Sequence, residues 1–281
     1  MIFLHDRLVA PEEARIDPAD RGFTLGDGLF ETLRAYTGRP FRLDAHLDRL
    51  VAGAVELGIP LPLPKARIAE AVAETLAANR LTGDAAIRIT LTRGPGARGL
   101  LPPEVPRPTL MIAATAWQPG PDRPLTAIIS PIRRNEHSPL SRLKTLGYLD
   151  NVLAQREAVA RGAEEAILLN GAGRLACAAR ANLFVVRDGR LLTPPASEGV
   201  LAGIARAEVL SIARSLGIPV LEAPVERKAL DGATEAFLTN SLIGVQALGS
   251  IDSRSVGNGA AGPVTTRIAT AYRQMTGELS R

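Results

Sequence analysis

The chain has 281 residues, with 33 basic and 29 acidic side chains and a formal net charge of +4. Hydrophobic residues make up 46% of it, enough for a buried core in one large domain or two ordinary ones. We find no apolar run of membrane-spanning length and no secretory signal. A single cysteine excludes an internal disulfide, so we expect a cytoplasmic protein with no membrane partner.

The sequence pI of about 9.7 raises the question of nucleic-acid binding. The basic residues are spread along the chain among acidic ones, and aromatic residues make up only 4%. We therefore expect no nucleic-acid partner. A modest positive field would instead suit an anionic small molecule.

The N-terminal part alternates strand and helix patterns, and each element ends at a Gly or Pro turn signal. In chain order we expect a strand at 28–36, helices at 43–57 and 66–78, and strands at 85–92 and 109–115.

Residues 117–124 (WQPGPDRP) are rich in proline and glycine, lack any periodicity, and predict an interdomain linker. The expected organisation is therefore a domain at 1–116, the linker, and a second domain at 125–281. In that second domain we expect a strand at 125–130, a helix at 148–161, a strand at 165–170, a hairpin at 183–192 and a helix at 204–216. The pattern indicates an α/β protein.

Several familiar sites are excluded by what surrounds their residues. The glycines of 94–99 match a dinucleotide-binding pattern, but Leu-Leu-Pro-Pro follows them and cannot open the required helix. The three histidines show no metal-ligand spacing and the cysteine stands alone, so we expect no metal site.

Lys144 is one of only three lysines in the chain, although basic residues number 33. Schiff-base formation is a task that arginine cannot perform, because it needs an amine that loses its proton. A solvated lysine would be the commoner interpretation of one such residue.

Residues 199–206 (GVLAGIAR) form a glycine-bearing turn into a helix, where free N–H groups bind phosphate well.

An ordered set of motifs covers nearly the whole chain and resembles the fold-type-IV pyridoxal-phosphate enzymes. The motifs are DRGFTLGDGLFETLR, FRLDAHLDRL, SRLKTLGYLDNVLA, GRLACAARANLF, GVLAGIAR and TNSLIGVQAL. The family includes branched-chain and D-amino-acid aminotransferases and 4-amino-4-deoxychorismate lyase. The resemblance implies a smaller N-terminal α/β domain, a larger C-terminal domain, pyridoxal 5′-phosphate between them, and a homodimer.

The resemblance also assigns site residues. It implies a catalytic lysine that carries the cofactor as a Schiff base, a group of phosphate contacts, and a tyrosine near the phenolic oxygen of the cofactor. The catalytic lysine is Lys144, and the tyrosine is Tyr148. The phosphate contacts are Arg49, Ile204, Ala205 and Ser241.

Cys177 is the main departure from the family pattern. Similar enzymes have a glutamate five residues before the Asn of the Asn-Leu-Phe motif, where it pairs with the pyridine nitrogen; here that Asn is Asn182 and the position holds Cys177. A carboxylate would keep the ring nitrogen protonated and make it a strong electron sink, whereas a thiol favours an unprotonated ring. By analogy with other pyridoxal enzymes, Cys177 suits elimination better than transamination. A compensating neighbour such as Arg180, or a loss of activity, stays possible.

The motifs look closest to aminodeoxychorismate lyase, which would release pyruvate and 4-aminobenzoate, a folate precursor. In that interpretation Lys144 abstracts the α-proton of the substrate. One departure is Leu100, which stands where lyases often have a tyrosine. The alternatives are an aminotransferase for D- or branched-chain amino acids and a pyridoxal-phosphate-binding protein with little catalysis.

Overall fold

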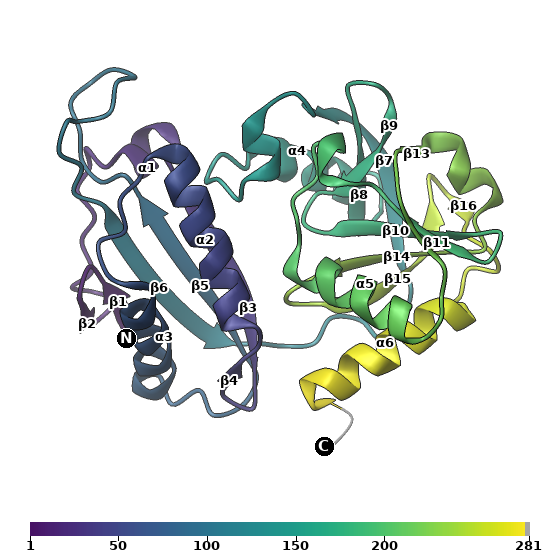
Figure 1. Cartoon of the computed structure of the whole chain (residues 1–281), viewed down its shortest axis with the longest axis horizontal. Helices are drawn as coiled ribbons and strands as arrows, with labels where there is room; N and C mark the ends of the chain where they lie inside the picture. The colour runs from purple at the N-terminus through teal and green to yellow at the C-terminus, as the bar shows by residue number, and fades with distance from the viewer. Residues whose placement is uncertain (279–281) are drawn as a thin grey trace. The chain divides into compact units, whose positions relative to one another are not determined.

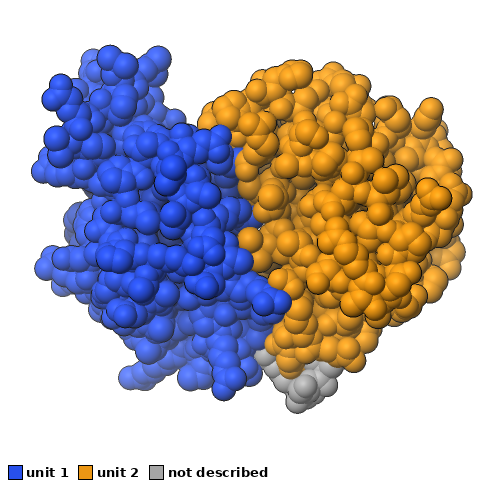
Figure 2. Space-filling model, in the orientation of Figure 1, with its two compact units in different colours: residues 1–118, 143–147 blue, residues 119–142, 148–281 orange. Residues whose placement is uncertain are grey.

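A computed structural model describes residues 1–278 and divides them into two compact units (Figure 1). Unit 1 comprises Met1–Gln118 together with Leu143–Gly147, and unit 2 comprises Pro119–Arg142 and the chain from Tyr148 onward. Figure 2 shows unit 1 in blue and unit 2 in orange. Lys144 therefore belongs to unit 1, although the residues on both sides of its short segment belong to unit 2.

Unit 1 is an antiparallel sheet with its two long helices on one face. Its strand order is β2-β1-β6-β5-β3-β4. The strands are β1 (Ile2–Leu4), β2 (Arg7–Val9), β3 (Gly28–Tyr36), β4 (Arg39–Pro40), β5 (Ala85–Thr92) and β6 (Thr109–Ala116). The helices are α1 (Arg21–Leu25), α2 (Leu43–Leu57) and α3 (Lys65–Ala78).

Alternation along the strands of unit 1 separates a helix-covered face from an open face. On β5, Ile87 and Ile89 point into a core that also holds Leu47 of α2 and Ile68 of α3. Residues between them, such as Arg88, point to the opposite face. The helices thus stabilise one side of the sheet and leave the other side to polar and aromatic side chains.

Unit 2 is built on a second sheet, ordered β12-β11-β10-β14-β15-β7-β8-β9-β13, which closes on itself because β9 also pairs with β10. Apolar side chains such as Leu169, Leu183 and Leu238 fill its interior. The strands are β7 (Leu125–Arg134), β8 (Glu165–Asn170), β9 (Arg174–Ala178), β10 (Asn182–Arg187), β11 (Arg190–Thr193), β12 (Val220–Glu222), β13 (Val225–Glu226), β14 (Glu235–Asn240), β15 (Gly244–Ile251) and β16 (Arg254–Ser255).

Three helices of unit 2 lie outside the closed sheet. They are α4 (Leu149–Ala160), α5 (Ile204–Ser215) and α6 (Pro263–Thr276). Helices α5 and α6 pack against each other and against β14, while α4 packs on β7 and β8 (Figure 1). No helix within residues 1–278 is long and apolar enough to cross a membrane.

The α/β class and the main predicted elements are confirmed. Strand β7 extends to Arg134, beyond the predicted end at Ser130, and its register with β8 shifts between Ile129 and Arg133, so simple alternation breaks there. The linker at 117–124 stays a prediction.

Candidate active site

Lys144 lies on the open face of the unit 1 sheet. Its carbonyl accepts a hydrogen bond from Phe30 N at 2.9 Å, and Leu146 N donates to Gly28 O at 3.0 Å. Leu29 pairs with Thr145 in an antiparallel bridge, so Lys144 stands opposite Phe30 and shares its face. The Lys144 Nζ atom is 4.2 Å from the centroid of the Phe30 ring. The backbone therefore fixes the direction in which this amine points.

The surroundings of Lys144 make its amine easier to deprotonate than that of an ordinary lysine. Burial, the neighbouring Arg49 guanidinium and, more weakly, Arg88 lower the pKa of Lys144 to about 8, and the opposing effect of Glu31 does not cancel them. A lysine with this pKa is half deprotonated near pH 8, whereas an ordinary lysine is almost fully protonated. Lys144 can therefore act as a nucleophile or as a base at ordinary pH.

A buried cluster on the helix-covered face orients Arg49. Arg49 of α2 donates from Nε and Nη2 to the two carboxylate oxygens of Glu31, at 2.8 and 2.7 Å. His46 Nδ1 lies 2.7 Å from Glu31 Oε2. Burial alone would raise the pKa of Glu31, but the hydrogen bonds from His46 and Arg49 hold that pKa below its ordinary value. Burial lowers the pKa of His46, so Glu31 and Arg49 form the charged pair.

Arg88 places a second cation on the open face. Its Cζ atom is 3.8 Å from the same Phe30 centroid that Lys144 approaches. Arg88 lies opposite Thr32 in the pairing of β5 with β3, and its side chain is exposed. An anionic group near Lys144 would therefore meet two positive charges on this face.

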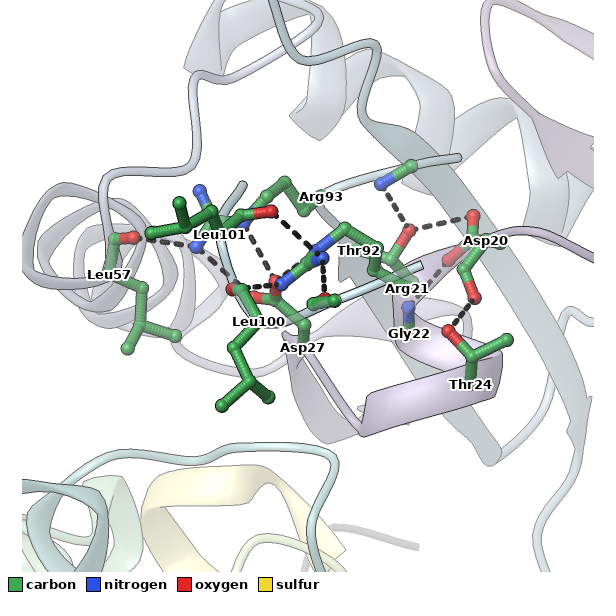
Figure 3. A network of polar contacts seen from close by, with 12 residues as sticks. Asp20, Arg21, Gly22, Thr24, Asp27, Leu57, Thr92, Arg93, Leu100 and Leu101 are labelled. Carbon is green, nitrogen blue, oxygen red and sulfur yellow. Dashed lines mark hydrogen bonds and ion pairs between the residues drawn. The ribbon is translucent and has the colours of Figure 1, made fainter. Parts of the chain in front are cut away.

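The loop that leads into β3 is held by two carboxylates (Figure 3). Asp20, which is fully buried, accepts hydrogen bonds from Gly22 N at 2.7 Å, Thr92 Oγ1 at 2.9 Å and Thr109 Oγ1 at 2.7 Å. It thereby joins the start of α1 to strands β5 and β6.

Asp27 is the second of these carboxylates. It accepts from Nε of Arg21 and of Arg93, both at 2.8 Å, and Arg93 also donates to the carbonyls of Leu57 and Gly58 at the end of α2 (Figure 3). The network thus fixes the strand that carries Glu31 and the helix that carries Arg49 relative to each other.

In unit 2, three polar side chains form a row across neighbouring strands. Cys177 at the end of β9 pairs with Asn182 at the start of β10, and Asn182 pairs with Thr239 near the end of β14. Residues directly opposite each other share one face of a sheet. Ser241, in the turn after β14, lies at the same end of the sheet.

The Cys177 thiol is neutral at ordinary pH. Burial raises its pKa, Glu165 acts in the same direction, and the opposing charge of Arg134 does not reverse the shift. Cys177 is buried with Ala176 and Val200. The site thus offers a neutral group where the family resemblance implies a carboxylate.

The start of α5 fits an anion. Gly203 is the N-cap and has no side chain to cap the first N–H groups, and no acidic residue stands in the first turn, which begins with Ile204 and Ala205. A Cβ atom at Gly203 would lie only 2.0 Å from Asn182 Oδ1, so a larger residue here would displace the Asn182 side chain. Phosphate is the group of pyridoxal phosphate that such a turn accommodates.

The predicted site residues fall into two groups. Arg49 and Lys144 lie in unit 1, and the others lie in unit 2, where Tyr148 directly precedes α4. Sequence reasoning missed Glu31 and His46. A carboxylate between Leu29 and Leu33 on the apolar face of its strand, and a histidine three positions before Arg49 on one helix face, were the available signals. Within residues 1–278, no group of three His, Cys, Asp or Glu side chains could hold a metal ion.

Comparison with known proteins places these residues in a family. Residues 28–251 match the family described as Amino-transferase class IV. The chain is 36% identical to "Putative branched-chain-amino-acid aminotransferase" of Methanocaldococcus jannaschii over 98% of this chain and 96% of that protein. It is 31% identical to D-alanine aminotransferase of Listeria innocua, covering 95% and 93%, and 30% identical to aminodeoxychorismate lyase of Bacillus subtilis, covering 98% and 94%.

Solved structures agree with the sequence comparison. The crystal structure of Escherichia coli branched-chain amino acid aminotransferase matches with a TM-score of 0.94 at 30% identity, covering 98% of this chain and 94% of that one. The fold is therefore the two-domain fold type IV. Members of this family use pyridoxal phosphate, which fits the lysine amine and the helix start described above. The chain is a pyridoxal-phosphate-dependent enzyme of the class IV aminotransferase family.

Proposed function

We propose that the protein is a lyase that converts 4-amino-4-deoxychorismate to 4-aminobenzoate and pyruvate. The observation that carries this proposal is Cys177, a buried neutral thiol at the position where the family pattern has a glutamate. When bound, pyridoxal phosphate supplies an electron sink for the pair of electrons left after proton loss beside the substrate amine. A neutral thiol weakens that sink. Aromatisation of the product supplies driving force of its own, so a lyase tolerates the weaker sink better than a transaminase does.

The proposed cofactor contacts are the residues that the family resemblance assigns. Their shared property is a polar group suited to one part of pyridoxal phosphate: an amine for the aldehyde, donors for the phosphate, and neutral groups for the ring. They are Lys144 for the aldehyde carbon, Arg49, Ile204, Ala205 and Ser241 for the phosphate, Cys177 for the pyridine nitrogen and Tyr148 for the phenolic oxygen.

Lys144 is the proposed acid–base group. With a pKa of about 8 its Nζ atom can accept the α-proton of the substrate and return a proton to the departing product. Arg88, on the same face, would attract a carboxylate of the substrate. Glu31 already holds the Arg49 guanidinium in place. Arg49 would therefore lose little side-chain entropy when it binds the cofactor phosphate.

The absorption spectrum of the purified protein tests the cofactor assignment. A visible band should disappear on borohydride reduction, and peptide mapping should find the reduced cofactor on Lys144. In a separate sample that has not been reduced, addition of 4-amino-4-deoxychorismate should release equal amounts of 4-aminobenzoate and pyruvate. Reduction that labels another lysine would overturn the role of Lys144. Cofactor-loaded, unreduced protein that releases no 4-aminobenzoate would overturn the lyase assignment.

An aminotransferase is the second candidate, because the chain is similar to proteins named for branched-chain and D-alanine aminotransferase activity. This candidate predicts that an amino acid converts the cofactor to its amine form and that a keto acid reverses the change. A protein that binds the cofactor on Lys144 but does neither reaction would match the third alternative, a binding protein with little catalysis.

A homodimer and a cytoplasmic location also belong to the proposal. Apolar side chains gather on α1 and on the loop between β5 and β6 of unit 1, where a partner surface would cover them. These are Phe23, Leu25, Leu100, Leu101 and Val105, of which Phe23, Leu100 and Leu101 are 80%, 83% and 87% exposed. Analytical ultracentrifugation should give twice the chain mass.

A further inference from the structure

Two side chains of unit 2 hold the backbone of the turn that leads into α5, residues 199–203. Asn182 Nδ2 donates to the carbonyl of Leu201 at 2.9 Å. Arg134 Nε donates to the carbonyl of Gly199 at 3.2 Å. Both hydrogen bonds draw carbonyl oxygens of the turn toward the protein. A turn that binds an anion has to keep its carbonyls away from the ligand and present its N–H groups.

Asn182 is well placed for this task. Its side chain is 7% exposed, and it lies between Cys177 and Thr239 in the row across β9, β10 and β14. Its Oδ1 atom lies against Gly203, where an added Cβ would come within 2.0 Å. The amide therefore contacts the turn at two points, once through Nδ2 at Leu201 and once through Oδ1 at the N-cap of α5.

Arg134 fixes the other end of the turn. Its Nη2 atom donates to the carbonyl of Ser141 at 2.7 Å, so the guanidinium is held between two backbone segments. Gly199 has a φ of +78°, and a Cβ there would lie 3.0 Å from Glu136 Cα. Glu136 is itself anchored, since its carboxylate accepts from the N–H of Gly171 at 2.8 Å. The turn thus packs on a fixed backbone.

We infer that Asn182 and Arg134 are positioning residues that hold residues 199–203 in the phosphate-binding conformation before the cofactor arrives. The inference rests on the proposed placement of the cofactor phosphate at the start of α5. Its physical basis is preorganisation: the apparent affinity falls in proportion to the fraction of protein whose turn has the competent conformation. Loss of one of these hydrogen bonds should lower the equilibrium constant for that conformation by about tenfold, and the competent fraction by up to the same factor.

The test compares pyridoxal phosphate with pyridoxal, which lacks the phosphate, on cofactor-free protein. Binding of each is followed by the absorption of the Schiff base. In Asn182→Leu, which has nearly the same shape, adds no charge and removes the donor, the dissociation constant for pyridoxal phosphate should rise by up to about tenfold. That for pyridoxal should change by less than about twofold. Arg134→Gln should act in the same way, and Arg134→Lys, which retains a donor, should recover part of the loss.

Asn151→Leu is the matched control. Asn151 Nδ2 donates to the carbonyl of Ala179 at 2.6 Å, so the substitution removes a buried bond of the same kind elsewhere in unit 2. It should lower the melting temperature but leave the ratio of the two affinities unchanged. If Asn182→Leu weakens both ligands equally, or if Asn151→Leu lowers the ratio as much, the inference is wrong. If the unsubstituted protein binds both ligands with equal affinity, the proposed phosphate placement itself is wrong.

Discussion

Replacing Arg88 by glutamine should raise the pKa of the Lys144 amine. Both cations approach the centroid of the Phe30 ring, Arg88 Cζ at 3.8 Å and Lys144 Nζ at 4.2 Å, so they lie within about 8 Å of each other. At that separation the repulsion between two unit charges is about 0.5 kcal/mol in water and about 2 kcal/mol at an effective dielectric constant of 20. Arg88 is exposed and is the weakest of the causes that shift this pKa, so the lower figure applies. Since 1.36 kcal/mol corresponds to one pKa unit, the pKa should rise from about 8 to about 8.4.

Carbon NMR of cofactor-free protein labelled with [13C]lysine measures this pKa directly. The chain has only three lysines, so three Cε signals are expected, and Lys144→Arg identifies the signal of interest. Arg88→Lys keeps the charge and should leave the pKa of Lys144 near 8. Burial is the largest cause of the shift, so the pKa should stay below 10.5 even in Arg88→Gln. A Lys144 signal that titrates near 10.5 in the unsubstituted protein would refute the reasoning from burial and like charge.

The remaining predictions concern charge and stability. Capture of pyridoxal phosphate should accelerate with rising pH and level off above about pH 8, because the neutral Lys144 amine is the reacting form; stopped-flow absorbance gives the profile. Cys177→Glu should raise transamination relative to elimination, measured as amine-form cofactor per 4-aminobenzoate released. Glu31→Gln should lower the free energy of unfolding by about 3–5 kcal/mol in urea melts, because it leaves a buried charge unpaired. Since the pKa of Glu31 lies below its ordinary 4.5, the stability it supplies is present above pH 4.5 and lost on further acidification; Glu31→Gln should flatten that acid limb.

Much of the fold could be predicted from local sequence patterns. Apolar spacing in 43–57 gave helix α2 with the bounds that the structure shows, and the Asp188-Gly189 turn gave the hairpin of β10 and β11. The short hairpin of β1 and β2 offers too few residues for a periodic pattern. The closing of the unit 2 sheet through Cys177 and Asn182 is a long-range pairing that no local pattern reports.

The site was less accessible to sequence reasoning because its geometry comes from pairing. Scarcity of lysine indicated Lys144, but only the pairing of Thr145 with Leu29 places its amine beside Phe30. The role of Arg88 follows from its face of β5, which depends on the register with β3. Asn182 stood in a recognisable motif, yet its contact with Leu201 joins segments that are distant along the chain.

The most direct test of the lyase assignment is the fate of the cofactor and substrate in one reaction. Pyridoxal-phosphate-loaded protein is mixed with 4-amino-4-deoxychorismate while the absorption spectrum, 4-aminobenzoate and pyruvate are followed together. We predict equal amounts of the two products over many turnovers, with the cofactor returning to its aldehyde form. Conversion of the cofactor to its amine form by D-alanine or a branched-chain amino acid, reversed by a keto acid and without release of 4-aminobenzoate from the chorismate compound, would contradict the assignment.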